Sequence, residues 1–292
     1  MEISMNAPIE IPTFDMGSQI PRIIHQTCPS KNRLSDVLAD NIQAIKAMNP
    51  GWEYRLYDDR AVDTFIVNSY GAEISNLFRR INPQYGAARA DLFRYLLMYK
   101  HGGVYLDIKS TTLKPLDSVI RPDDKFILAH WRNEPGEPFA GWGMQKEFGF
   151  DRKREVQQWH IITVPGHPFL RRVIEQVLKN IQNYRSWVHG VGGRGVWKTT
   201  GPIAYTLAIE PLMSTNSYRM VANETELSLQ YNIYNEAGHY NLFSTTYYGL
   251  RSDPVVSMEG WCSMPMHHIY VQARKVYRHF VLENFHREMK NG

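Results

Sequence analysis

The stretch that decides the fold is residues 87–116, which read AARADLFRYLLMYKHGGVYLDIKSTTLKPL. Its first half predicts a helix over residues 87–101, on which Asp91 and Arg94 share one face because they are three residues apart. The glycine pair at 102 and 103 ends this helix, since the left-handed backbone common at helix ends favours glycine. The stretch therefore predicts a helix that carries an acidic and a basic side chain together.

A short strand is predicted at residues 104–107, directly after the glycines. Because successive side chains of a strand alternate, Tyr105 and Asp107 should point to the same face. Asp107 then lies at the carboxyl end of a buried parallel strand, the edge at which open α/β sheets bind ligands. A carboxylate there can hold a ribose hydroxyl or a divalent cation that bridges a diphosphate. The alternatives are an exposed helical ion pair for Asp91 and Arg94, and a simple turn residue at Asp107.

Strand-like and helix-like segments alternate on both sides of this stretch. Further strands are predicted at residues 20–27, 52–57, 125–130 and 160–164, and further helices at 36–48, 61–80, 169–184 and 271–289. This alternation predicts an α/β protein whose central Rossmann-like sheet is flanked by helices. We expect one domain over residues 1–292, with a nucleotide-binding half at 20–130 and an acceptor-side half at 131–292.

The composition is that of an ordinary globular protein. Hydrophobic residues make up 43% and charged residues 21% of the 292 residues, and the net charge of +4 is too small to indicate nucleic-acid binding. The two cysteines, Cys28 and Cys262, exclude a disulfide framework and favour a reducing compartment. The sequence has neither the start of a signal peptide nor an apolar run of membrane-spanning length. We therefore expect a soluble, cytoplasmic protein without a nucleic-acid partner.

The run A-x-x-A-D-x-x-R-Y-x-x-x-Y-x-x-G-G-x-Y-x-D from residue 87 resembles the sugar-binding core of glycosyltransferase family 32. Four more motifs match in the same order, namely IPRIIHQT from residue 20, WEYRLYDD from 52, PGHPFLRRVI from 165 and TTGPIAY from 199. The resemblance implies a GT-A fold and a hexosyltransferase, of the kind found in polysaccharide biosynthesis. It also implies transfer from a nucleotide-sugar donor to a saccharide or another hydroxyl acceptor, with retention of configuration.

The resemblance further implies which residues act. Asp91, Arg94 and Asp107 are the expected catalytic residues, with Asp91 and Arg94 on the donor sugar. Other donor contacts are expected from the first strand, from the end of the strand at 104–107 and from the two later motifs; these residues are Ile24, His25, Gln26, Thr27, Tyr105, Lys109, Gln158, His160, Thr200 and Gly201.

One position departs from the family, which usually has D-x-D where this chain has Asp107-Ile108-Lys109. An ammonium about 4 Å from Mn²⁺ would cost on the order of 8 kcal/mol at an effective dielectric constant of 20. Either Lys109 points away and a Mn²⁺ or Mg²⁺ ion is bound by Asp107 with His267 and His268, or the ammonium neutralises the diphosphate instead. Since strand side chains alternate, Asp107 and Lys109 should face the ligand and Ile108 the core.

Three more segments have two interpretations each. The aromatic-rich residues 131–150 predict either an acceptor-sugar surface or a self-packed loop. Residues 190–202 contain G-x-G-x-x-G but follow a helix, which favours a flexible loop that closes over the donor rather than a dinucleotide site. The helix at 271–289 has an apolar stripe and several basic residues, which predicts docking on the core; the alternative is peripheral membrane contact near a lipid-linked acceptor.

The sequence leaves GDP-mannose and a UDP-hexose open as donors. It also leaves two other functions open. The missing second aspartate suggests a sugar-nucleotide-binding module with impaired catalysis, and Asp107 with either histidine suggests a metal-dependent phosphohydrolase.

Overall fold

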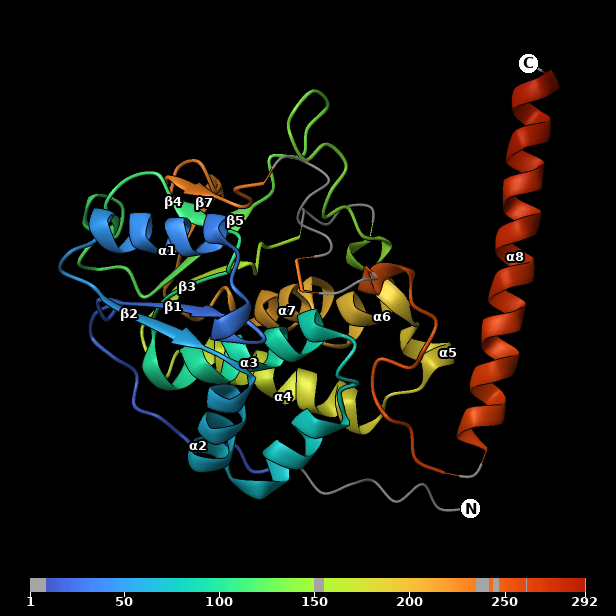
Figure 1. Cartoon of the computed structure of the whole chain (residues 1–292), viewed down its shortest axis with the longest axis horizontal. Helices are drawn as coiled ribbons and strands as arrows, with labels where there is room; N and C mark the ends of the chain where they lie inside the picture. The colour runs from blue at the N-terminus through green and yellow to red at the C-terminus, as the bar shows by residue number, and fades with distance from the viewer. Residues whose placement is uncertain (1–8, 150–154, 235–241, 244–246, 261, 292) are drawn as a thin grey trace.

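The computed structural model describes residues 9–149, 155–234, 242–243, 247–260 and 262–291, and side chains of the last helix up to residue 277. Its centre is a six-stranded sheet with helices on both faces (Figure 1). The strands are β1 (Ile23–Thr27), β2 (Glu53–Tyr57), β3 (Gly103–Leu106), β4 (Thr111–Thr112), β5 (Phe126–His130), β6 (His160–Thr163), β7 (Arg219–Asn223) and β8 (Leu229–Gln230). The helices are α1 (Asp36–Met48), α2 (Asp59–Arg80), α3 (Gly86–His101), α4 (Pro168–Gln182), α5 (Ser186–His189), α6 (Gly192–Thr199), α7 (Pro202–Ile209) and α8 (Ser263–Asn291).

The strand order β2-β1-β3-β6-β5-β7 places the deciding stretch in the middle of the sheet. Strands β2, β1 and β3 are parallel, β6 is antiparallel to both its neighbours, and β5 pairs in parallel with β7. The carboxyl ends of β1, β3 and β5 and the start of β6 therefore lie at one edge. The predicted α/β class, with a central sheet flanked by helices, is confirmed, although the strand predicted at 160–164 is antiparallel. Strands β4, β7 and β8 were not predicted.

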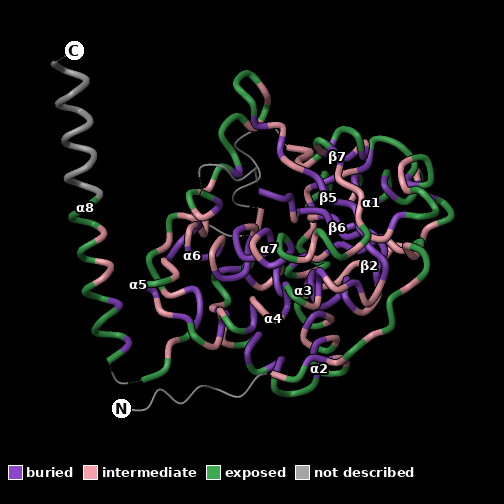
Figure 2. The backbone as a smooth tube through the Cα atoms, turned by 180° about the vertical axis from the view of Figure 1, so that it is seen from behind, coloured by how far each residue is buried: buried purple, intermediate pink, exposed green. Residues whose placement is uncertain are grey.

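Side-chain alternation divides the core between the two faces of the sheet. Tyr105 packs in a cluster with residues of α2, α3, α4 and α7. Val104 and Leu106 pack on the other face, where α1 contributes Ile45. The buried residues concentrate around α3 and the sheet (Figure 2). The predicted alternation is therefore confirmed for residues 104–106.

Helix α3 is buried on almost all sides, and this decides the role of its polar pair. Asp91 is 2% exposed and Arg94 is 4% exposed, so the alternative of an exposed helical ion pair is wrong. The helix is enclosed because it is covered by the sheet on one side and contacts α2, α4 and α6 on others. A buried pair of charges requires several polar partners, which are found in the site.

Two segments differ from the sequence prediction in their local structure. Residues 192–199 form helix α6 rather than a flexible loop. Its glycines allow close packing, because a Cβ at Gly192 would come within 2.6 Å of the Gly249 carbonyl oxygen and one at Gly195 within 2.7 Å of the Gly190 oxygen. The helix predicted at 61–80 is present as α2, but Gly71 interrupts it with φ 77° and kinks it.

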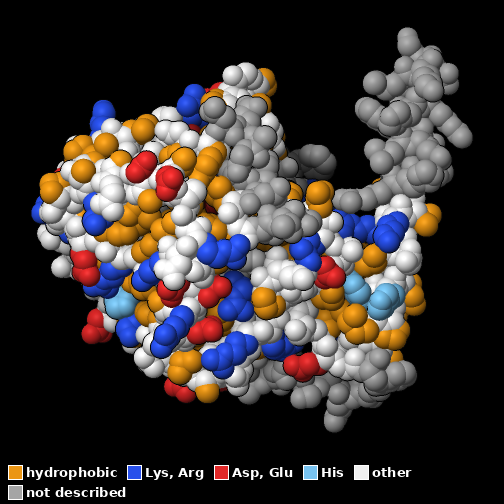
Figure 3. All heavy atoms as spheres, in the orientation of Figure 1, with side chains coloured by type: hydrophobic (Ala, Val, Ile, Leu, Met, Phe, Trp, Pro, Cys, Tyr) orange, Lys and Arg blue, Asp and Glu red, His pale blue; other side chains and the backbone are white. Residues whose placement is uncertain are grey.

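The last helix, α8, begins at Ser263 and extends away from the body (Figures 1 and 2). Its first turns pack against α5, where His267 Nδ1 lies 3.0 Å from Ser186 Oγ. Further along, Ile269, Val276 and Tyr277 are 64–70% exposed, and apolar and basic side chains follow one another along this part (Figure 3). The predicted docking of the helix at 271–289 is wrong for Val276 and Tyr277, which are 70% and 69% exposed, and the packed first turns of α8 precede the predicted helix. The predicted stripe beyond residue 277 lies outside the described side chains. Among the described residues, no helix is long and apolar enough to cross a bilayer.

Candidate active site

Two adjoining cavities open at the sheet edge where β1 and β3 end. The first has a volume of about 520 Å³ and is lined by residues after β1, by the starts of α2 and α3, and by Leu242, Phe243 and Tyr248. The second, of about 630 Å³, is lined by the segment after β5, the start of β6, and α6. Both share Arg94, Asp107 and Lys109, so these three charged side chains stand at the junction.

Arg94 forms the centre of a buried polar network. Its guanidinium contacts Asp91 Oδ1 at 3.2 Å and Asp107 Oδ1 at 3.0 Å, and it donates a 2.8 Å hydrogen bond to the Gln158 carbonyl oxygen. Asp91 also accepts hydrogen bonds from Gln158 Nε2 at 3.1 Å and from Thr200 Oγ1 at 2.9 Å. Burial raises the pKa of Asp91, and Arg94 opposes this shift. The side chains of Arg94 and Asp91 are therefore held in one arrangement before any ligand binds.

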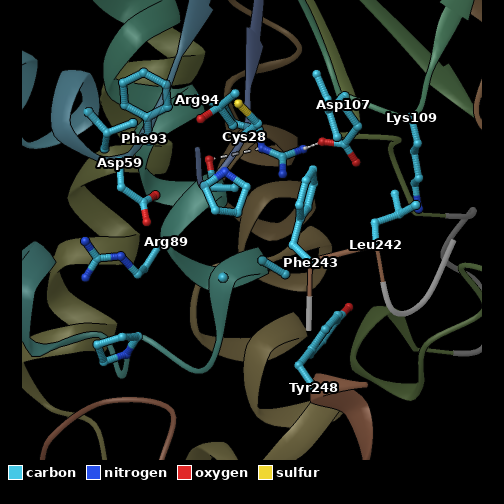
Figure 4. A pocket seen from close by; sticks show the side chains of 18 of the residues that line it. Cys28, Asp59, Arg89, Phe93, Arg94, Asp107, Lys109, Leu242, Phe243 and Tyr248 are labelled. Carbon is cyan, nitrogen blue, oxygen red and sulfur yellow. Dashed lines mark hydrogen bonds and ion pairs between the residues drawn. The ribbon is translucent and has the colours of Figure 1, made fainter. Parts of the chain in front are cut away.

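Asp107 and Lys109 belong to a tight turn rather than to a strand. β3 ends at Leu106, and the Ser110 N–H donates to the Asp107 carbonyl oxygen at 2.8 Å. Asp107 and Lys109 line the same two cavities, and this turn rather than strand alternation brings them together. Ile108 packs with Cys28 and Leu38 as expected, and it also lines the first cavity. Figure 4 shows Arg94 joined to Asp107, with Lys109 beyond it.

Lys109 connects the charged junction to the aromatic part of the second cavity. Its ammonium donates a 2.8 Å hydrogen bond to Tyr231 Oη and lies 4.1 Å from the centre of the Tyr231 ring. Burial lowers the pKa of Lys109 to about 8, while the Asp107 charge acts in the opposite direction. The ammonium thus lies in a sparsely hydrated place, where its interaction with an anionic ligand is stronger than in water.

Of the four predicted donor residues on β1, only Thr27 lines a cavity. Ile24 packs in the core, and His25 is fully buried, with Nε2 3.1 Å from the Gly102 carbonyl oxygen. Gln26 donates to the Asp107 carbonyl oxygen at 3.0 Å and accepts from Tyr54 Oη at 2.6 Å. Gln26 therefore positions the Asp107 turn from behind.

The later predicted donor residues divide in the same way. Gln158 lines the second cavity and joins Asp91 to Arg94. Thr200 lies behind Asp91, and Gly201 precedes the first residue of α7; neither lines a cavity. His160 is buried, with Nε2 3.0 Å from Gln157 Oε1, and also lies away from both cavities.

The side chains at the junction do not fit a divalent cation. Within the described residues, no group of three His, Cys, Asp or Glu side chains is arranged to hold one. Asp107 is paired with Arg94, and the Lys109 charge also acts on it. His267 and His268 lie on α8, and the structure brings neither of them to the cavities that Asp107 lines.

Sequence reasoning missed several cavity residues. Asp59 and Arg89 lie at the end of the first cavity away from Asp107 (Figure 4), and Glu155 and Tyr231 lie on the wall of the second. Asp59 comes shortly after the carboxyl end of β2, and this position could have predicted that it lies near a ligand site. Glu155 lies in a segment without periodicity, and no local pattern distinguished it.

The residues of this site lie in a region that is similar to known glycosyltransferases. Residues 35–127 match the family described as "Glycosyltransferase sugar-binding region containing DXD motif", a range that includes Asp91, Arg94, Asp107 and Lys109. The match supports the resemblance to glycosyltransferase family 32, and the matched region has Asp107-Ile108-Lys109 in place of D-x-D.

Individual proteins are similar to parts of the chain. The chain is 29% identical over 140 residues to the initiation-specific alpha-1,6-mannosyltransferase of Candida albicans, covering 44% of this chain and 34% of that protein. It is 31% identical over 185 residues to the mannosyl phosphorylinositol ceramide synthase CSH1 of Saccharomyces cerevisiae, covering 63% of this chain and 41% of that protein. The chain thus spans between a third and a half of the length of these relatives. Among solved structures, the PaToxG glycosyltransferase aligns over 68% of this chain and 71% of its own, with 14% identity and a TM-score of 0.48.

Proposed function

We propose that this chain is a hexosyltransferase that moves a sugar from a nucleotide-sugar donor to a hydroxyl acceptor. The observation that carries the proposal is the meeting of two cavities at Arg94, Asp107 and Lys109, inside the matched sugar-binding region. The nucleoside would occupy the first cavity beside Thr27, the diphosphate would lie at Arg94 and Lys109, and the acceptor would enter through the second.

The residues would act by positioning and by charge stabilisation. Arg94 and Lys109 face the negative charge that develops on the diphosphate as the bond from the anomeric carbon to oxygen breaks. Asp91, held by Thr200 and Gln158, accepts hydrogen bonds from the hydroxyls of the donor sugar. The acceptor oxygen forms the new bond to the anomeric carbon and its proton passes to the departing diphosphate. This is the retaining route that the family resemblance favours.

We further propose that Lys109 replaces the metal that D-x-D relatives are expected to use. A cationic side chain beside Asp107 disfavours a second cation there by several kcal/mol but favours a diphosphate. The Asp107–Arg94 pair and the buried ammonium support this proposal.

Donor binding with and without metal tests both proposals. Calorimetry would measure binding of GDP-mannose and of UDP-glucose, in EDTA and across a Mn²⁺ series, for the wild type, Lys109→Ala and Lys109→Asp. We expect wild-type binding of one donor to persist in EDTA. Lys109→Ala should weaken it at least tenfold, or about 1.4 kcal/mol, and Lys109→Asp should make it depend on Mn²⁺. Lys179→Ala, an exposed change on α4, is the matched control.

Release of nucleoside diphosphate completes the test. Binding without release, with any acceptor, would indicate a binding module, and phosphate release from simple esters would indicate a phosphohydrolase. If wild-type binding requires Mn²⁺ and Lys109→Ala has no effect, the proposed role of Lys109 is contradicted.

A further inference from the structure

The second cavity has a wall of aromatic side chains that do not line the first cavity. The Trp131 ring centre lies 5.3 Å from that of Trp142 and 5.1 Å from that of Tyr231, and Phe139 packs against all three. These rings form a self-packed cluster, as one interpretation of residues 131–150 predicted. Trp142 is nevertheless 38% exposed and lines the cavity, so part of its surface is available to a ligand.

Glu155 lies in the same wall and is 5% exposed. Its Oε1 accepts a 2.9 Å hydrogen bond from Trp131 Nε1, and its backbone N–H donates to the Gly143 carbonyl oxygen at 3.1 Å. Gly143 permits this approach, because a Cβ there would lie 2.8 Å from Glu155 Cβ and 2.9 Å from Trp131 Cδ1. The carboxyl group is therefore fixed against the aromatic cluster by contacts on both sides.

The carboxylate of Glu155 adds a negative charge to this wall of the cavity. Within the described part of the chain no lysine or arginine forms an ion pair with this carboxylate, and the charges that line the cavity with it are Asp91, Arg94, Asp107 and Lys109. Burial raises its pKa to about 7, and the hydrogen bonds from Trp131 and Gln145 oppose this. A buried carboxylate attracts neutral hydrogen-bond donors and repels anions.

A sugar ring has the surface that this wall would bind. Its hydroxyls donate hydrogen bonds to a carboxylate, and its C–H face can pack on an indole ring. We propose that Glu155 and Trp142 form the acceptor subsite and that its occupant is a neutral saccharide rather than an anionic lipid headgroup. This inference rests on the proposed transferase function and names the acceptor class for it.

Three variants, together with a neutral probe and an anionic one, test the proposal. The variants are Glu155→Gln, Trp142→Ala and the control Glu175→Gln, which changes a glutamate on α4 away from both cavities. Acceptor probes are methyl α-mannoside, methyl α-glucoside and maltose, compared with vesicles containing phosphatidylinositol. The measurements are nucleoside diphosphate release, donor binding by calorimetry and melting temperature.

We expect at least one saccharide to accelerate nucleoside diphosphate release by the wild type, and the vesicles to have no such effect. Glu155→Gln and Trp142→Ala should each raise the KM for that saccharide at least tenfold, with donor Kd and acceptor-free donor hydrolysis within twofold of the wild type. Because Glu155→Gln keeps the size of the side chain and Trp142 is partly exposed, at least one variant should retain its melting temperature.

The failures of the two proposals are distinguishable. If the wild type binds and hydrolyses donor, but a folded Glu155→Gln or Trp142→Ala protein has an unchanged saccharide KM, the acceptor subsite is overturned and the transferase proposal stands. If the vesicles accelerate nucleoside diphosphate release and none of the saccharides does, the acceptor subsite is also overturned. If the wild type binds no nucleotide sugar, the transferase proposal fails and the acceptor subsite fails with it.

Discussion

Asp91 contributes to stability as well as to the site. It holds hydrogen bonds from Thr200 and Gln158 and an ion pair with Arg94, all in a buried place. We expect Asp91→Ala to lower the free energy of unfolding by about 3 kcal/mol, because it removes one partner of a buried charge pair. Asp91→Asn keeps the shape and should cost about 1 kcal/mol, while both variants lose nucleoside diphosphate release.

Urea unfolding and product release would measure these effects, with the exposed change Asp40→Asn as the control. Full stability of Asp91→Ala would contradict the role assigned to the network. The helical spacing of Asp91 and Arg94 correctly placed them on one face. It could not show that this face is covered, because the covering residues Gln158 and Thr200 are more than 60 positions away in the chain. A substitution of Asp91 should therefore cost more stability than it would on an exposed face.

The turn from α3 into β3 depends on two glycines with positive φ. A Cβ on Gly103, where φ is 96°, would lie 2.5 Å from the Ile23 carbonyl oxygen, so the neighbouring strand β1 would have to move. We expect Gly103→Ala to destabilise the protein by more than 2 kcal/mol and to impair donor binding, since β1 and β3 carry Thr27 and Asp107 to the site.

Gly86→Ala is the matched control, because the first residue of α3 has no atom within 4 Å of its added Cβ and a helix favours alanine. Measured melting temperatures of the two variants would test this prediction, and equal values would contradict the steric argument.

The glycine pair, the strand after it and most elements before residue 185 were predictable from local patterns. The antiparallel direction of β6 and the helical state of α6 were not, because both depend on contacts with distant segments, such as that of Gly192 with Gly249.

At the scale of the whole molecule, three buried neutral histidines make stability depend on pH. Burial lowers the pKa of His25 and of His160 to about 3 and that of His167 to about 4. Between pH 5 and 6.5 these side chains bind protons almost entirely in the unfolded chain, so the free energy of unfolding should rise with pH in this window. The limit for three groups is about 4 kcal/mol per pH unit. The raised pKa values of Glu155 and Asp91 act in the opposite direction and reduce the slope.

Denaturant unfolding at pH 5, 5.5, 6 and 6.5 would measure this slope. His167→Gln should reduce it by up to about 1.4 kcal/mol per pH unit, most strongly near pH 5, whereas His268→Gln, an exposed change, should leave it unaltered. A stability that is constant over this range would contradict the prediction. Sequence patterns placed His25 and His160 on strands, and the family resemblance assigned both to the donor site. A strand position does not show whether a side chain reaches a cavity, and both side chains are buried away from the two cavities.

The hydrogen bond between Lys109 and Tyr231 couples ligand binding in the first cavity to ligand binding in the second. Lys109 belongs to the charged junction and Tyr231 to the aromatic cluster. A ligand that moves either side chain therefore alters the free energy with which a second ligand binds in the other cavity. Thermodynamic linkage is reciprocal: whatever factor a bound donor applies to saccharide affinity, the saccharide applies to donor affinity. A donor diphosphate that draws Lys109 away from Tyr231 would thus change the position of the Tyr231 ring in the second cavity, where the acceptor is proposed to bind. The two substrates would then bind cooperatively rather than independently.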